Sequence, residues 1–107
     1  MKIGSFEEIV LLATGALGDE AYGASIRDLL QENMGKVSSI GALHSALYRL
    51  EEKGFATSFE GGVTAERGGR RKKFYRLTVK GRKALEETQA LRIRFARQIP
   101  GINYGFP

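Results

Sequence analysis

The sequence predicts a mainly helical fold with one small β-hairpin. Apolar residues recur at helical spacing up to Lys53, alternate with polar residues between Phe55 and Thr78, and return to helical spacing after Thr78. The 107 residues, 42% of them hydrophobic and 27% charged, have the composition of one globular domain. The longest apolar stretch, from Ile9 to Ala13, is far shorter than the ~20 residues that cross a bilayer. We therefore expect no membrane segment.

The first helix is predicted to begin at Ser5 and to end before Gly18. Ser5 and Glu8 have the spacing of a capping box, in which each side chain accepts a hydrogen bond from the other residue's backbone N–H. A glycine such as Gly18 is typical of a helix end. The predicted inward face consists of Phe6, Ile9, Val10, Ala13 and Leu17.

A second helix is predicted from about Tyr22 to Met34, where Gly35 ends it. Its inward residues are Ile26, Leu29 and Leu30, and its outward residues are Arg27, Asp28 and Glu32.

A third helix is predicted to begin near Ser38 or Ser39 and to continue to Lys53. At about 100° per residue, one stripe of this helix is apolar and is expected in the core. It consists of Ile40, Leu43, Leu47 and Leu50. The opposite face is small and polar, with one arginine at its far end. It consists of Ser38, Ala42, Ser45 and Arg49.

A hairpin and a last helix complete the predicted order. Two strands with alternating side chains are joined by a long tip from Gly61 to Lys72. Thr78 is placed to cap the last helix, which is predicted from Val79 to about Gln98. One face of that helix carries Ala84, Leu85, Thr88, Leu91 and Phe95.

This order of elements is that of a winged helix-turn-helix, with a three-helix core, a two-stranded wing and a C-terminal dimerisation helix. We expect the winged domain over residues 1–78, the C-terminal helix over residues 79–99 and a tail over residues 100–107.

The positive charge of the chain is concentrated in the predicted wing and just after it. Nine bases and no acid lie between Arg67 and Lys83, whereas the other eight bases face all twelve acids. The net charge is +5. Such a segment is typical of a surface that contacts a polyanion, although a solvated charged face has the same composition.

Together, the small polar face of the third helix and the basic wing predict a regulator that binds double-stranded DNA. A helix fits the major groove, and basic side chains displace counterions from phosphates. The expected contacts of the recognition helix are Ser38, Ser39, Ala42, His44, Ser45 and Arg49. The expected contacts of the wing are Arg67, Arg70, Arg71, Lys72 and Lys73.

Several alternatives stay open on the sequence. His44, beside the apolar stripe, is either a boundary residue or a DNA contact, and Arg49 either contacts phosphate or pairs with a nearby carboxylate. The alternative to DNA binding is a protein–protein module whose basic wing meets an acidic partner. RNA binding calls for exposed aromatic residues, for which Phe74 and Tyr104 are the candidates.

Catalysis is not expected. The chain has no cysteine and one histidine, so it offers neither a nucleophile–base pair nor a cluster of metal ligands. The glycine-rich stretch in the wing lacks the spacing of a phosphate-binding loop. We therefore expect no enzyme activity, no metal and no cofactor.

The last helix shows more apolar surface than a small three-helix core covers, which predicts a homodimer. The expected interface residues are Leu85, Thr88, Leu91 and Phe95. The alternative is that this helix folds back over its own domain.

Three segments of the sequence carry a family resemblance. They are residues 40–54 (IGALHSALYRLEEKG), residues 66–78 (ERGGRRKKFYRLT) followed by Gly81 and Arg82, and residues 17–23 (LGDEAYG) followed by Ile26. Over roughly residues 5 to 90 they resemble the third helix, the wing and the first inter-helix turn of PadR-like transcriptional regulators. The resemblance implies a homodimeric bacterial repressor in the cytoplasm, bound to the nucleoid when on DNA, that responds to a ligand or to stress. With one C-terminal helix, an effector pocket is expected at the dimer interface.

Overall fold

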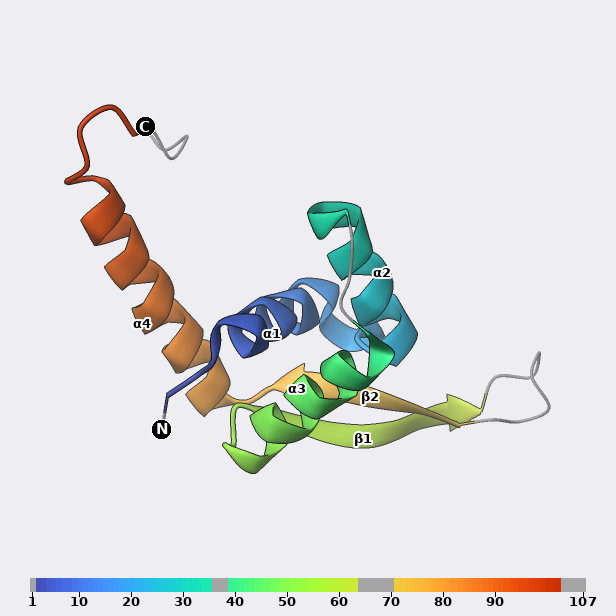
Figure 1. The fold of residues 1–107 in the computed structure, drawn as a ribbon. Coiled ribbons are helices and arrows are strands. Elements are labelled where there is room, and N and C mark those ends of the chain that lie inside the picture. The colour runs from blue at the N-terminus through green and yellow to red at the C-terminus, as the bar shows by residue number, and fades with distance from the viewer. Residues whose placement is uncertain (1, 36–38, 64–70, 103–107) are drawn as a thin grey trace.

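The computed structural model describes residues 2–35, 39–63 and 71–102. Their elements follow the predicted order (Figure 1). A 3-10 helix, η1, lies between α1 and α2, and the two strands form one antiparallel sheet. The predicted winged helix-turn-helix class is confirmed. The elements are α1 (Ser5–Leu17), η1 (Gly18–Glu20), α2 (Gly23–Met34), α3 (Ile40–Glu52), β1 (Ala56–Val63), β2 (Arg71–Leu77) and α4 (Val79–Ala96).

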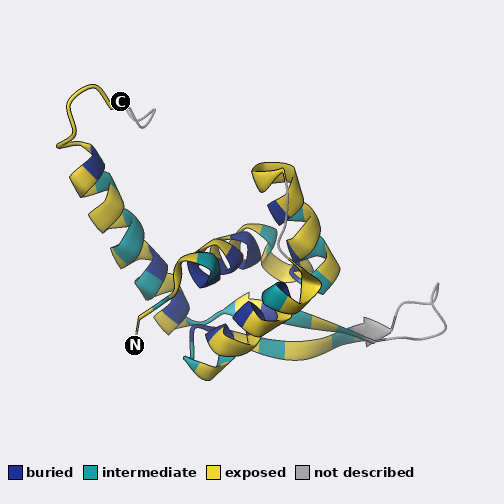
Figure 2. Cartoon of the chain, in the orientation of Figure 1, coloured by how far each residue is buried: buried dark blue, intermediate teal, exposed yellow. Residues whose placement is uncertain are grey.

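The core lies where α1, α2 and α3 meet the base of the hairpin, and Figure 2 shows the buried residues on the facing sides of these helices. The predicted core leucines of α3 are buried, and so are Val10, Leu11 and Ile26. Ile9, predicted on the inward face of α1, is exposed, and so is Ile40, half of whose surface is exposed. Ile40 is the first residue of α3, and helical spacing gives its direction but not how far the neighbouring helices extend.

The start of α1 differs by one residue from the prediction. Gly4 rather than Ser5 is the N-cap, and the carboxylate that accepts its N–H, at 3.0 Å, belongs to Glu7 rather than Glu8. The predicted capping pair was therefore wrong. Because Glu8 is not used as a cap, its carboxylate is available to α4.

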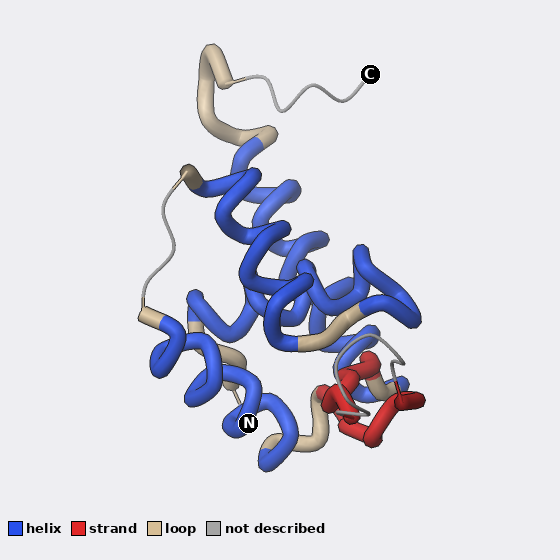
Figure 3. The backbone as a smooth tube through the Cα atoms, turned by 90° about the vertical axis from the view of Figure 1, so that its right-hand side faces the viewer, coloured by secondary structure: helices blue, strands red, loops and turns tan. Residues whose placement is uncertain are grey.

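The hairpin is paired further than predicted. Phe59 pairs with Phe74, and after an irregularity beyond Glu60 the pairing reaches Val63 and Arg71. Part of the predicted tip therefore belongs to the strands, and the remainder, residues 64–70, lies outside the described residues. Seen after a turn of 90°, the strands lie together at one edge of the molecule (Figure 3).

The junction between hairpin and α4 is tightly built. The Thr78 hydroxyl accepts the N–H of Gly81 at 2.9 Å, which confirms the predicted cap, and donates to the Gly54 carbonyl at 2.6 Å. A side chain on Gly81 would place its Cβ 1.9 Å from the carbonyl oxygen of Phe55. The start of α4 therefore depends on a glycine at this position.

Beyond this junction α4 passes the first turn of α1, which Gln89 and Arg92 contact, and its last turns extend away from the body of the protein (Figure 1). The molecule measures 56 × 29 × 26 Å along its principal axes, and the later turns of α4 make up one end of it. The described helices include none that is long and apolar enough to cross a membrane.

Candidate nucleic-acid interface

The outward face of α3 carries small and polar side chains, as predicted. Ser39 caps the helix, and its hydroxyl accepts the N–H of Ala42 at 3.2 Å. Ser39, His44 and Ser45 are exposed, and Ala42 is half-buried. Ser38 lies outside the described residues. The backbone of α3 is therefore free to approach a flat or grooved partner closely along this face.

Arg49, at the far end of that face, contacts a carboxylate of its own chain. Its Nε donates to Oε2 of Glu7 at 2.7 Å, and Lys53 Nζ donates to Oε1 of the same carboxylate at 2.7 Å. Of the two interpretations of Arg49, the structure gives the carboxylate pair. About half of the Arg49 side chain is still exposed, so its outer edge remains accessible to solvent.

Glu7 is a buried anion at the start of α1, with 5% of its surface exposed. Burial by itself raises the pKa of this carboxyl, but hydrogen bonds from Lys53, the Gly4 backbone and Arg49 outweigh it and hold the pKa at about 2. Glu7 therefore stays ionised. It ties the last turns of α3 to the first turn of α1.

His44 lies next to the start of α2. A Cβ on Gly23, the first residue of α2, would lie 3.9 Å from Cε1 of the imidazole. The residue is exposed and at the same time borders another helix. Both interpretations of His44 therefore agree with its position.

The predicted wing residues fall on both sides of the described boundary. Arg67 and Arg70 lie outside the described residues, and Arg71 begins β2. Lys73 is exposed, and its Nζ lies 3.6 Å from Oε1 of Glu51. Lys72 is half-buried. Of the predicted wing contacts, Lys72 and Lys73 are therefore the two whose side chains the structure describes.

Three aromatic rings at the base of the wing were missed as site residues. Tyr22 meets Phe74 edge-on at 5.4 Å, and Phe74 stacks on Phe59 at 5.8 Å. Cations cover the two outer rings: Lys72 Nζ lies 4.2 Å from the Tyr22 centroid, and the Arg76 guanidinium 4.6 Å from that of Phe59. The alternation of side chains within each strand could have indicated that Phe59 and Phe74 lie on one face of the hairpin. No local pattern in the sequence indicates that Tyr22 contacts the wing.

Of the two candidates for stacking on RNA bases, Phe74 is half-buried between two other rings. Tyr104 lies outside the described residues.

The residues expected at a dimer interface divide into two groups along α4. Leu85 is buried in the chain's own core and Thr88 is half-buried. Leu91 and Phe95 are 45% and 61% exposed. The second group forms an apolar strip on the last turns of α4, and the exposed Ile99 follows just after the helix.

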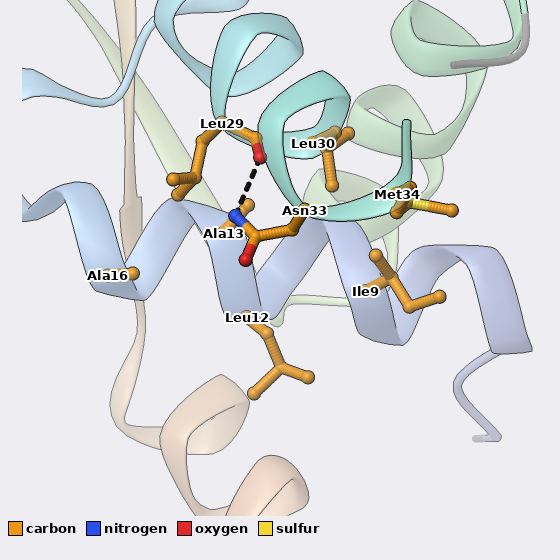
Figure 4. Close-up of a pocket in the computed structure, with 8 residues that line it drawn as sticks. All are labelled: Ile9, Leu12, Ala13, Ala16, Leu29, Leu30, Asn33 and Met34. Atoms are coloured by element: carbon orange, nitrogen blue, oxygen red, sulfur yellow. Dashed lines mark hydrogen bonds between the residues drawn. The ribbon is translucent and has the colours of Figure 1, made fainter. Parts of the chain in front are cut away.

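A second apolar surface opens between α1 and α2, as a groove of about 220 Å³ (Figure 4). Asn33 contributes its side chain, whose amide donates to the Leu29 carbonyl at 2.8 Å. The groove is lined by Ile9, Leu12, Ala13, Ala16, Leu29, Leu30, Asn33 and Met34. No group of three or more metal-ligating side chains occurs in the part of the chain that the structure describes.

Comparison with known proteins identifies the family. Residues 11–87, well over half of the chain, match the model of the transcriptional regulator PadR-like family. The chain belongs to this family. The segment matched in this PadR-like regulator runs from α1, through the whole wing, to the middle of α4.

Solved structures agree with this assignment. A PadR family transcription regulator from Clostridium difficile R20291 is 26% identical, with a TM-score of 0.68 over 88% of this chain and 93% of that one. A PadR family regulator from Eggerthella lenta DSM 2243 is 25% identical, with a TM-score of 0.65 over 84% and 76%.

A more distant likeness extends to the fold alone. Streptococcus pneumoniae FabT, solved in complex with DNA, is 20% identical, with a TM-score of 0.65 over 96% of this chain and 64% of that one. The curated proteins include none that matches the chain.

The exposed strip of this PadR-like regulator lies outside the family match. Leu91 and Phe95 follow residue 87, where the matched segment ends. The family match therefore ends before this apolar strip.

Proposed function

We propose that this PadR-like regulator is a homodimeric repressor that binds duplex DNA sequence-specifically. The observation that carries the proposal is the outward face of α3, which is small, polar and exposed and lies beside a basic wing. FabT, which has the same fold, was solved with DNA bound. In this proposal α3 enters the major groove, where the pattern of donors and acceptors distinguishes all base pairs.

The wing supplies affinity rather than sequence discrimination. Its lysines and arginines would contact phosphates and release counterions, which strengthens binding to every duplex alike. The residues proposed for this role are Arg67, Arg70, Arg71, Lys72 and Lys73.

Two apolar surfaces support the proposed homodimer. Leu91 and Phe95 are exposed on the last turns of α4. Ile9 and Leu12 are exposed in the groove between α1 and α2. Burying one such side chain gains ~1.5–3 kcal/mol, and a two-fold axis doubles the gain. We propose that α4 packs against a second copy, which would set two α3 helices about one turn of DNA apart.

Repression would follow from occupancy, because a dimer covering two successive major grooves blocks access to that segment of DNA. A small-molecule effector, if the protein responds to one, is proposed to bind where the α1/α2 groove meets the second copy. Such a protein would act in the bacterial cytoplasm, on the nucleoid when bound to DNA.

Selection of bound sequences from a random duplex pool tests the proposal. We expect one enriched motif with two half-sites about one helical turn apart. Affinity for that motif is expected to fall steeply as salt rises. Failure to enrich any motif, together with salt-independent binding, would contradict it and favour a module that binds an acidic protein instead.

A further inference from the structure

Lys72 differs from the other described cations of the wing in what its ammonium contacts. Nζ lies 4.2 Å from the centroid of the Tyr22 ring. Lys73 and Arg76 also lie over rings, those of Tyr75 and Phe59, but each has in addition a carboxylate oxygen at 3.6 Å. A ring attracts a cation through its quadrupole and leaves the net charge unchanged, whereas a carboxylate cancels it. Within the described residues, Lys72 is therefore held in place by a ring and not by a carboxylate.

The Tyr22 ring is itself fixed from several directions. Its backbone forms an isolated bridge with Phe74, and its ring meets the Phe74 ring at 67°. Its N–H donates to the Ser25 hydroxyl at 2.9 Å, at the start of α2. The next residue back, Ala21, accepts the N–H of Tyr75 at 2.8 Å. The ring is therefore a platform anchored to both α2 and β2.

This platform lies between the wing and α3. Tyr22 directly precedes Gly23, whose backbone faces the His44 imidazole. An ammonium held over Tyr22 is thus next to the residue that borders the His44 edge of α3. A DNA groove that receives α3 is bordered by backbone phosphates, which are the natural partners of a cation at such an edge.

We propose that Tyr22 is a positioning residue for DNA binding, whose ring holds the Lys72 ammonium against a backbone phosphate beside α3. This inference rests on the DNA binding proposed above. The ring performs this role and the hydroxyl does not, because the cation lies over the ring centroid. The contact is with phosphate, so its effect is the same on every sequence.

The test measures binding of the full chain to a fluorescent random-sequence duplex over a series of salt concentrations. Lys72→Met keeps the length of the side chain and removes its charge, and we expect the salt slope to fall by about 0.9. Tyr22→Leu is expected to weaken binding about 2- to 5-fold. Added to Lys72→Met, Tyr22→Leu should cause no further loss. Tyr22→Phe keeps the ring and should bind like the wild type.

Lys83→Met is the matched control, since it removes an exposed lysine that is not among the proposed DNA contacts. It should change the salt slope less than Lys72→Met. Thermal melting of each variant shows whether it still folds. If Tyr22→Leu lowers the melting temperature of the protein, Tyr22→Gln is used in its place.

The outcomes separate the two proposals. A wild type that binds duplex without salt dependence would overturn the proposed function. A wild type that binds with a steep slope, while Tyr22→Leu weakens binding equally with and without Lys72, would overturn the positioning role alone.

Discussion

Arg92 of α4 donates two hydrogen bonds to the buried carboxylate of Glu8 in α1. Nη2 donates to Oε1 at 2.8 Å and Nε to Oε2 at 3.1 Å. Gln89 adds a third bond to Oε2 at 2.6 Å. α4 is therefore tied to the first turn of α1 by polar contacts about one and two turns beyond the buried Leu85.

Arg92→Ala should destabilise the fold by about 1–3 kcal/mol, because it leaves a buried carboxylate with fewer donors. Urea unfolding measures the loss. Arg94→Ala removes an exposed arginine of the same helix and is the control. Equal unfolding midpoints for the two variants would show that the pair does not contribute.

Stability should depend on acid pH through Glu7. Its pKa is about 2 in the folded protein, against 4.5 for an ordinary glutamate, so the unfolded chain binds the proton more readily. Roughly 3 kcal/mol of stability is therefore present above pH 4.5 and is lost as the pH falls toward 2. Unfolding of the wild type and Glu7→Gln across this range checks it. The two curves should converge near pH 2, and parallel curves would contradict the assignment.

Gly81→Ala should destabilise by several kcal/mol, since its Cβ would lie 1.9 Å from the Phe55 carbonyl oxygen and the start of α4 must move. Gly41→Ala is the matched control. Gly41 is exposed in α3, and the nearest atom to its Cβ, the Ser39 hydroxyl, is 3.8 Å away. Alanine there should stabilise by about 0.5–1 kcal/mol. Thermal melting distinguishes the two, and similar shifts would refute the packing described.

Ser45→Trp should change or abolish the preferred DNA sequence while leaving the fold intact, because Ser45 is exposed on the face proposed to enter the groove. Selection from a random duplex pool measures preference, and circular dichroism checks the fold. Glu32→Trp, on the exposed side of α2, is the control. An unchanged motif with Ser45→Trp would mean that another surface reads the DNA.

Leu91→Asp combined with Phe95→Asp should turn the dimer into a monomer, because charges at the proposed interface would be buried without partners. Sedimentation equilibrium measures the mass. Lys83→Asp changes an exposed residue near the start of α4 and should leave the dimer unchanged. A monomeric wild type would refute the proposed assembly.

Elements and much of the core could be predicted from this sequence because their signals are local. The spacing of Leu43, Leu47 and Leu50 is set by the helix itself, and Gly35 adopts the left-handed conformation, with φ of 74°, expected of a helix end. The α3 face could be predicted for the same reason.

Contacts between distant residues could not be predicted in this way. Two examples are the contact of Arg49 with Glu7 and the contact of Tyr22 with Lys72. Such contacts depend on how helices and strands are oriented in space, and the spacing of apolar residues does not give that orientation. The capping error has a similar origin. Glu7 and Glu8 both have plausible local partners, and tertiary contacts with α3 and α4 decide which of them caps α1.

Glu7 and Glu8 are neighbours, yet one holds α3 and the other holds α4. A single turn of α1 thus contacts both the helix proposed to read DNA and the helix proposed to join two copies. The contact that fixes α4 on α1 and the contact that fixes α3 on α1 are therefore one residue apart, although Arg49 and Arg92 are more than forty residues apart in sequence. In the proposed dimer, the interface helix α4 and the DNA-reading helix α3 would therefore be held by adjacent residues of α1.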